Sequence, residues 1–73
     1  MRLSWDAVFK QDNEGFIQPR FGFEMKDKWV SKNIKVRSGA SLNGIDFFLF
    51  EGLDMKFEKS GLSGVKLVGF YKG

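Results

Sequence analysis

Cationic side chains and a tryptophan are concentrated in the stretch from Met25 to Ala40. This stretch carries five lysine or arginine residues and a single acidic residue, Asp27, and Trp29 lies between two of the lysines. Cationic grooves that also hold aromatic rings bind single nucleic-acid strands, because the cations neutralise phosphates and the bases stack on the rings. The residues predicted to bind nucleic acid are therefore Lys26, Lys28, Trp29, Lys32, Lys35 and Arg37.

Other interpretations of these residues stay open at this point. The formal net charge is only +3, and a solvated strand face whose lysines keep a sheet soluble would have the same composition. Trp29 could equally belong to a thin core, where a small domain buries most of its large aromatic rings. The pattern also does not distinguish DNA from RNA, and it indicates no sequence preference.

The residue types that usually carry catalysis are missing. The chain has no histidine and no cysteine, so it lacks the commonest general base and the thiol nucleophile. No phosphate-cradling glycine loop leads into a helical pattern, and Asp46, Glu51 and Asp54 match no known calcium or magnesium spacing. We therefore expect a protein that is not an enzyme, with no cofactor and no metal site.

The length of the chain, 73 residues, predicts one domain over residues 1–73. A domain of this size buries only about 60% of the surface that its unfolded chain exposes. Because disulfides are excluded by the absence of cysteine, self-association is the expected additional support. The longest apolar run, Phe47 to Phe50, is far shorter than the roughly 20 residues that cross a bilayer. We expect a cytoplasmic protein without a membrane partner.

The spacing of apolar residues predicts strands rather than helices. In Trp29 to Val36 the apolar positions alternate with polar ones, as in a half-buried strand. Ile45 to Phe50 is apolar on both parities apart from Asp46, which is typical of a strand covered on both faces. We therefore expect an all-β domain of five or six short antiparallel strands, either a meander sheet or a small barrel.

Further strands and turns complete this prediction. Leu3 to Phe9 and Phe16 to Met25 are expected strands joined by a turn at residues 11–15, where Gly15 supplies a positive φ. Asn43-Gly44 suits a turn with both residues at positive φ, and Val65 to Tyr71 is the last expected strand. The predicted core consists of Phe21, Val30, Ile34, Val36, Phe47, Leu49 and Leu67.

The run Phe47 to Phe50 also predicts contacts with proteins. A sheet this small has difficulty covering both faces of one strand, so one face could dock on a partner. This is the alternative function, a non-catalytic modulator that binds another protein, for example a host polymerase, nuclease or replication factor. The same strand could instead pair with its copy in a homodimer that buries Phe48 and Phe50. A third possibility places both phenylalanines in the core, against Trp5 and Phe70.

The stretch from Asn13 to Gly44 resembles the septation regulator family, the stage V sporulation protein G family of small bacterial DNA-binding proteins. The features that carry this resemblance are Asn13-Glu14-Gly15 before a strand, Trp29-Val30 leading to Ile34-Lys35-Val36 and Gly39, and Asn43-Gly44 before an apolar strand. They cover under half of the chain. The resemblance implies an antiparallel sheet, a strand-mediated dimer and DNA binding.

The chain departs from the family after the apolar strand. The family continues with a Met-Pro-Ser type turn and a basic segment that runs into a helix, whereas Glu51-Gly52-Leu53-Asp54 is acidic and has no proline. Any DNA contact of that basic segment is therefore not implied for this chain. A virus-encoded or otherwise shortened relative would fit such a pattern.

Overall fold

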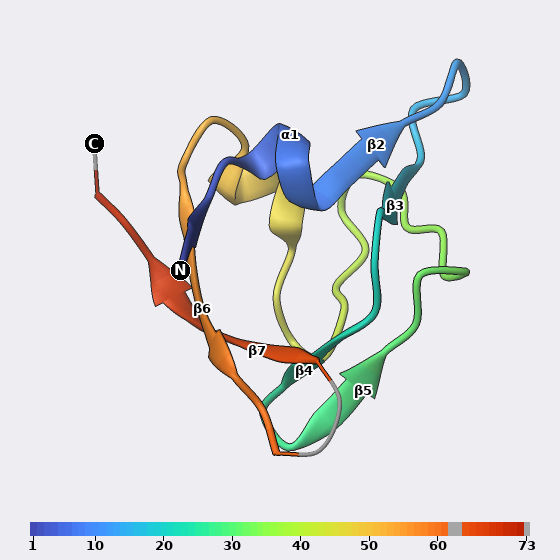
Figure 1. Cartoon of the computed structure of the whole chain (residues 1–73). Helices are drawn as coiled ribbons and strands as arrows, with labels where there is room; N and C mark the ends of the chain where they lie inside the picture. The colour runs from blue at the N-terminus through green and yellow to red at the C-terminus, as the bar shows by residue number, and fades with distance from the viewer. Residues whose placement is uncertain (62–63, 73) are drawn as a thin grey trace.

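The computed structural model describes residues 1–61 and 64–72, in which short strands surround two single helical turns (Figure 1). The elements in chain order are β1 (Arg2–Leu3), α1 (Trp5–Val8), β2 (Phe9–Gln11), β3 (Ile17–Pro19), β4 (Phe23–Met25), β5 (Lys28–Val30), the 3-10 helix η1 (Phe47–Phe50), β6 (Met55–Lys59) and β7 (Val65–Phe70).

The strands form two sheets. One has five strands in the order β1-β6-β7-β4-β5, and the other is the two-stranded hairpin β2-β3. β4 and β7 run parallel and pair at Glu24 and Lys66, whereas the other paired strands are antiparallel. The expected β-rich domain is therefore confirmed, but the sheet is mixed and open, with β1 and β5 at its edges. The β6–β7 hairpin joins the sheet beside β4, and this placement makes the β4–β7 pair parallel.

The expected strand from Leu3 to Phe9 is wrong, because a helical turn interrupts it. The Ser4 hydroxyl accepts a hydrogen bond from the Ala7 N–H at 3.2 Å, which caps α1. Trp5 and Val8 are both buried, and their spacing of three places them on one side of a helical turn. The alternation of apolar and polar residues predicted a strand, but Trp5 and Val8, the residues that α1 buries, are spaced as on one side of a helix.

The expected apolar strand from Ile45 to Phe50 is also wrong. The Asp46 carboxylate accepts a hydrogen bond from the Phe48 N–H at 3.0 Å, and residues 47–50 form η1. This turn buries Phe47 and leaves Leu49 77% exposed. A strand with two covered faces is therefore replaced by a turn with one buried side and one solvent side.

The strand expected from Trp29 to Val36 is shorter than the pattern predicts. β5 ends at Val30, and the Ser31 hydroxyl then accepts a hydrogen bond from the Asn33 N–H at 3.1 Å, which forms a turn. Further along the chain, Val36 pairs with Ile17 in an isolated antiparallel bridge. The segment between β5 and this bridge therefore passes from the large sheet to the β2–β3 hairpin.

Both turns that the sequence predicts are confirmed. Gly15 has a φ of 87° in the turn between β2 and β3. Asn43 and Gly44 have φ values of 50° and 84°, and they connect the bridge partners Leu42 and Ile45. Each of these positions needs the left-handed region that glycine and asparagine tolerate best.

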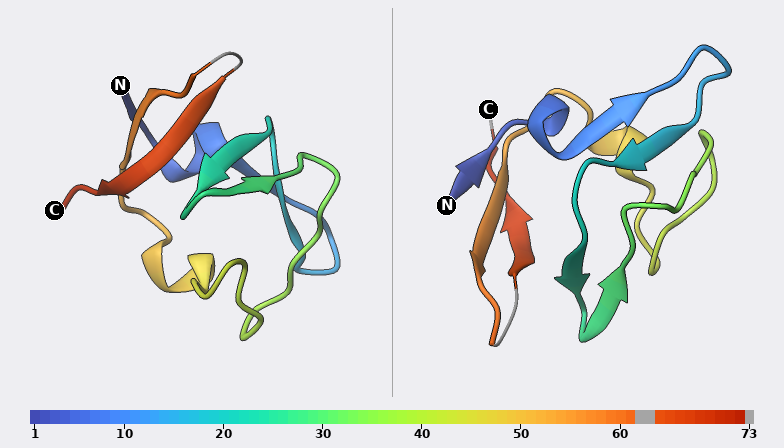
Figure 2. Two further views of the ribbon diagram at one scale, coloured as in Figure 1. Left: turned by 90° about the horizontal axis from the view of Figure 1, so that it is seen from below. Right: turned by 45° about the vertical axis from the view of Figure 1, so that its right-hand side comes forward.

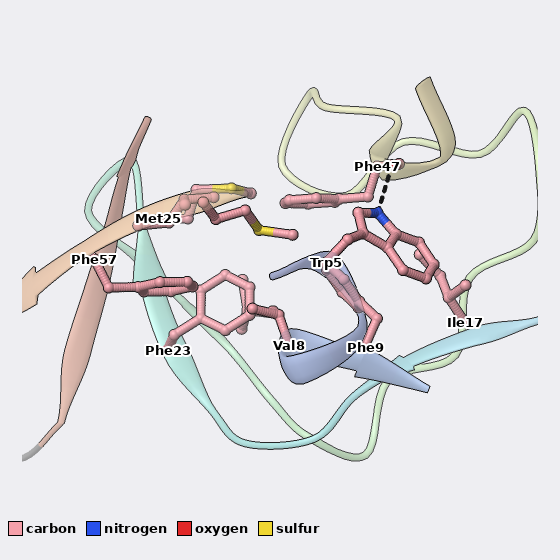
Figure 3. Close-up of a cluster of buried hydrophobic side chains, with 11 residues drawn as sticks. Trp5, Val8, Phe9, Ile17, Phe23, Met25, Phe47 and Phe57 are labelled. Atoms are coloured by element: carbon pink, nitrogen blue, oxygen red, sulfur yellow. Dashed lines mark hydrogen bonds between the residues drawn. The ribbon is translucent and has the colours of Figure 1, made fainter. Parts of the chain in front are cut away.

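Phenylalanine rings from both sheets and from η1 fill the core (Figure 3). Phe23 and Phe57 meet edge to face with ring centroids 5.5 Å apart, and Phe9 and Phe47 lie 4.9 Å apart. Of the seven residues predicted for the core, Val30, Phe47 and Leu67 are buried and Phe21, Ile34 and Val36 are half-buried; only Leu49 is wrong.

Within residues 1–61 and 64–72, no helix has the length and apolar character needed to cross a membrane.

The two tryptophans allow a matched test of this core. The buried Trp5 indole N–H donates to the Phe47 carbonyl at 3.1 Å, so Trp5→Phe leaves that carbonyl without a partner and should cost about 2 kcal/mol of unfolding free energy. Trp29 is 59% exposed, and Trp29→Phe should cost less than about 1 kcal/mol. Urea unfolding followed by circular dichroism measures both. Equal losses for the two variants would contradict the role of the Trp5 hydrogen bond.

Candidate functional site

Basic side chains from three parts of the chain line one groove beside the β2–β3 hairpin. The groove has a volume of about 300 Å³, and we call it the basic groove. Its lining residues are Lys10, Gln18, Pro19, Arg20, Lys32 and Asn33. Three of these are cations, and no carboxylate is among them, so the lining favours an anionic ligand.

Backbone hydrogen bonds explain why these distant residues meet. Ile17 and Val36 exchange N–H···O bonds of 2.7 and 2.9 Å, which holds the segment after β5 alongside β3. The Gln18 side-chain amide then donates to the Lys32 carbonyl at 2.9 Å. Lys10 and Gln18 are cross-strand partners in the hairpin, so they share a face.

Arg20 has a fixed side chain in the basic groove. Its Nε donates to the carbonyls of Asp6 at 2.8 Å and of Phe9 at 3.2 Å. These two acceptors use the Nε–H only, so the terminal Nη groups are left to bind a ligand. A guanidinium held in this way is suited to paired hydrogen bonds with a phosphate or a carboxylate.

A second hollow of about 290 Å³ continues from the basic groove along the hairpin, and the two share Lys10 and Gln18. At its far side the Lys35 ammonium lies 3.6 Å from the Asp12 carboxylate. The Arg37 guanidinium lies over the Phe16 ring, 4.7 Å from its centroid. The two hollows adjoin at Lys10 and Gln18, and we call them together the cationic track; their lining holds Lys10, Arg20, Lys32, Lys35 and the carboxylate of Asp12.

The Asp12 carboxylate organises the hairpin turn at the end of this track. It accepts hydrogen bonds from the N–H groups of Glu14 at 2.9 Å and of Phe16 at 3.0 Å. Partial desolvation alone would raise the pKa of Asp12. The backbone bonds and the Lys35 ammonium outweigh this and lower the pKa below its ordinary value of 3.8.

The structure divides the predicted site between the segment that follows β5, which lies beside the β2–β3 hairpin, and the β4–β5 hairpin. Lys32 lies in the basic groove, and Lys35 and Arg37 continue the track. The other three predicted residues, Lys26, Lys28 and Trp29, belong to the β4–β5 hairpin, where all three are exposed.

Trp29 is a surface residue rather than a core residue, and its position is defined by Gly22. A Cβ atom on Gly22 would lie 2.4 Å from Cζ2 of the indole, so the ring lies directly over the glycine. Trp29 as a whole is 59% exposed, and the Gly22 backbone lies against one side of its indole. This arrangement leaves an aromatic surface open to solvent.

Sequence reasoning missed Lys10 and Arg20, which the structure brings into the groove. The expected turn at residues 11–15 could have identified Lys10. A hairpin closed by this turn places Lys10 opposite Gln18, so that both side chains lie on one face. Arg20 lies two residues beyond Gln18 and therefore shares that side of the strand. Lys10 and Arg20 were missed because the prediction relied on the concentration of cations between residues 25 and 40, and these two residues lie outside that stretch.

The residues expected at a dimer interface pack within the single chain. The Phe50 ring stacks on Phe70 with a centroid distance of 4.2 Å and an interplanar angle of 12°. Phe48 is half-buried and packs against the core. Both residues lie in η1 and not on a strand. A dimer formed by pairing this segment with its copy as strands is therefore not supported. Self-association itself stays a prediction.

Comparisons with protein families, with curated proteins and with solved structures find no match to this chain. The resemblance of Asn13 to Gly44 to the septation regulators therefore stays a hypothesis that depends on those residues alone. The preference of the basic groove for an anionic ligand is argued from its lining residues alone.

The lowered pKa of Asp12 predicts a pH-dependent contribution to stability. A carboxyl group whose pKa is lower when folded stabilises the fold above its unfolded pKa of about 3.8, and this contribution is lost as the pH falls through the folded value. Asp12→Asn should therefore lower the urea midpoint at pH 7, and its difference from the native chain should shrink toward pH 2. A difference that stays constant with pH would exclude this role.

Proposed function

We propose that this protein is a nucleic-acid-binding protein, not an enzyme, and that the basic groove holds the phosphates of a single strand. The observation that carries the proposal is the fixed guanidinium of Arg20 in a groove that also contains Lys10 and Lys32 and no carboxylate. Cations positioned before the ligand arrives lose little side-chain freedom on binding, which favours tight contact with phosphate.

The shape of the site favours a polymer over a single small anion. The basic groove adjoins the second hollow at Lys10 and Gln18, so the two together are longer than one phosphate group requires. A strand that follows this track would meet Lys32 at one end and the Arg37 guanidinium on Phe16 at the other.

Trp29 adds an aromatic surface within reach of the same strand. Three peptide units separate it from Lys32, so their Cα atoms lie within about 11 Å of each other. The exposed indole on Gly22 could stack a base, which contributes roughly 1 to 3 kcal/mol per base in single-strand complexes. Single-stranded nucleic acid offers both the phosphates and the unpaired bases that this arrangement accommodates.

The salt dependence of binding tests the role of the groove. With about three phosphate contacts, affinity for a fluorescein-labelled 15-mer of deoxythymidine should fall about twentyfold between 50 and 200 mM salt. In the double variant Lys10→Gln and Lys32→Gln, affinity at 50 mM should fall at least tenfold, with a shallower slope. Fluorescence anisotropy measures both quantities.

The matched control is the pair Lys56→Gln and Lys59→Gln, which removes the same charge from exposed positions on β6. Figure 1 shows β6 on the side of the molecule opposite the β2–β3 hairpin. The control pair should keep near-native affinity. Equal losses for both pairs, or no binding of the native chain up to about 50 μM at 50 mM salt, would refute the groove as the binding site.

Tryptophan fluorescence tests the stacking surface separately. Trp5 is buried and Trp29 is exposed, so oligonucleotide binding should quench only the emission of Trp29. The quenching should disappear in Trp29→Phe, while Trp5→Phe should retain it. Quenching that persists in Trp29→Phe would remove the indole from the interface and leave the phosphate contacts to be judged by the lysine variants.

A further inference from the structure

An apolar groove with different lining lies between β7 and the segment that includes η1. It has a volume of about 370 Å³, and we call it the β7 groove. Its lining residues are Met25, Lys26, Ile45, Phe50, Leu67, Val68, Gly69 and Phe70. None of them lines the basic groove, so the two sites can be tested independently.

One wall of the β7 groove is an open strand edge. β7 pairs with β6 along its length, but on its other side it meets β4 only at Lys66. Among residues 1–61 and 64–72, no strand lies beside Val68–Phe70 on that side. β4 and β7 are parallel, as the left view of Figure 2 shows, and β4 ends at Met25. Backbone groups on an open edge can pair with an added strand.

The rest of the lining is apolar apart from Lys26. Ile45 and Phe50 line the groove together with β7, and the Phe50 ring stacks on Phe70. Alternate side chains of an added strand would meet these residues. Backbone pairing along β7 together with apolar pockets is the combination that strand-addition sites use to bind extended peptides.

The end of the groove nearest β4 carries a positive charge. Lys26 lines the groove there, and its Nζ lies 3.6 Å from the position that a Cβ on Gly44 would occupy. Lys26 forms no ion pair within the described residues. Lys26 and Asp27 both have positive φ values, 52° and 63°, although neither is glycine or asparagine. The two-residue turn that joins β4 to β5 requires this left-handed backbone.

We propose that the β7 groove binds the C-terminal end of a partner protein as an added strand. The segment runs antiparallel to β7, places apolar side chains against Ile45 and Phe50, and ends with its carboxylate at Lys26. The direction follows from the charge: a strand that runs antiparallel to β7 travels from Phe70 toward the end of β4. The open edge of about three residues, close to 10 Å, specifies a short, weakly bound segment.

The probe is a pool of acetylated hexapeptides with a free C-terminal carboxylate. Threonine occupies three alternate positions, and valine, isoleucine, leucine, phenylalanine or methionine occupies the other three, including the last. The member that binds best is titrated into ¹⁵N-labelled protein. Chemical-shift changes should concentrate at Met25, Ile45 and Val68–Phe70, and amidation of the peptide carboxylate should weaken binding at least fivefold.

Two variants and one altered peptide separate the contributions. Lys26→Met should remove the difference between the acid and the amide, because the carboxylate then has no cation to meet. Leu49→Ala, a change beside the groove at a residue that does not line it, should leave both affinities unchanged. Proline in place of the threonines should abolish binding, since proline cannot donate a ladder hydrogen bond.

Three results would overturn the proposal. The first is that no member of the pool binds below about 1 mM. The second is that binding occurs equally well for the acid and the amide, or that the shifts appear at the basic groove. The third is a homodimer in sedimentation that the peptide dissociates, which would assign the β7 groove to a second copy of the chain.

Discussion

The hydrogen bond between the Trp5 indole and the Phe47 carbonyl joins the two helical turns across the core. It is buried, and the Phe9 ring packs against the rings of both residues. Residues 47–50 of η1 pair with no strand among the described residues, so this bond and the surrounding rings hold η1 in the core. Because η1 supplies Phe50 to the β7 groove and the chain after β5 supplies Lys32 to the basic groove, both candidate sites depend on how this long segment is held.

The two grooves also show how a small domain separates two kinds of surface. The basic groove is built on the β2–β3 hairpin, where the polar face of the strands is turned to solvent and Arg20 is fixed by backbone carbonyls. The β7 groove is built where the large sheet is incomplete. One surface offers fixed charge, and the other offers unpaired backbone beside apolar side chains. The two therefore suit different classes of ligand, and neither needs a residue of the other.

Much of the local structure could be predicted because local residues cause it. The turns at Gly15 and Asn43-Gly44 and the burial of Val30 follow from backbone preference and alternation. α1 could not be predicted in this way. Its four residues alternate as a strand would, but a helical turn is what buries Trp5 and Val8 on the same side. η1 was missed for a similar reason: the Asp46 cap competes with strand pairing, and only the surrounding core decides between them.

The candidate site was only partly predictable because it is assembled from non-local parts. Lys32, Lys35 and Arg37 could be identified from charge and spacing. Their neighbours Lys10 and Arg20 join them only because Ile17 and Val36 form a bridge that no periodicity in the sequence indicates. The parallel contact between β4 and β7 is a further example, since it joins Glu24 to Lys66, which are far apart in the sequence, and decides where the sheet stays open.

The position of β7 has a consequence for how the chain acquires its structure. β7 comes last among the described elements, yet it lies at the centre of the five-stranded sheet, between β6 and β4. During synthesis, the β4–β5 hairpin would emerge first and would have no neighbour on its inner edge until β7 had been made. The large sheet therefore cannot be completed progressively from its N-terminal part. Its assembly waits for a long-range closure, which is slow and leaves early strands open to wrong pairing.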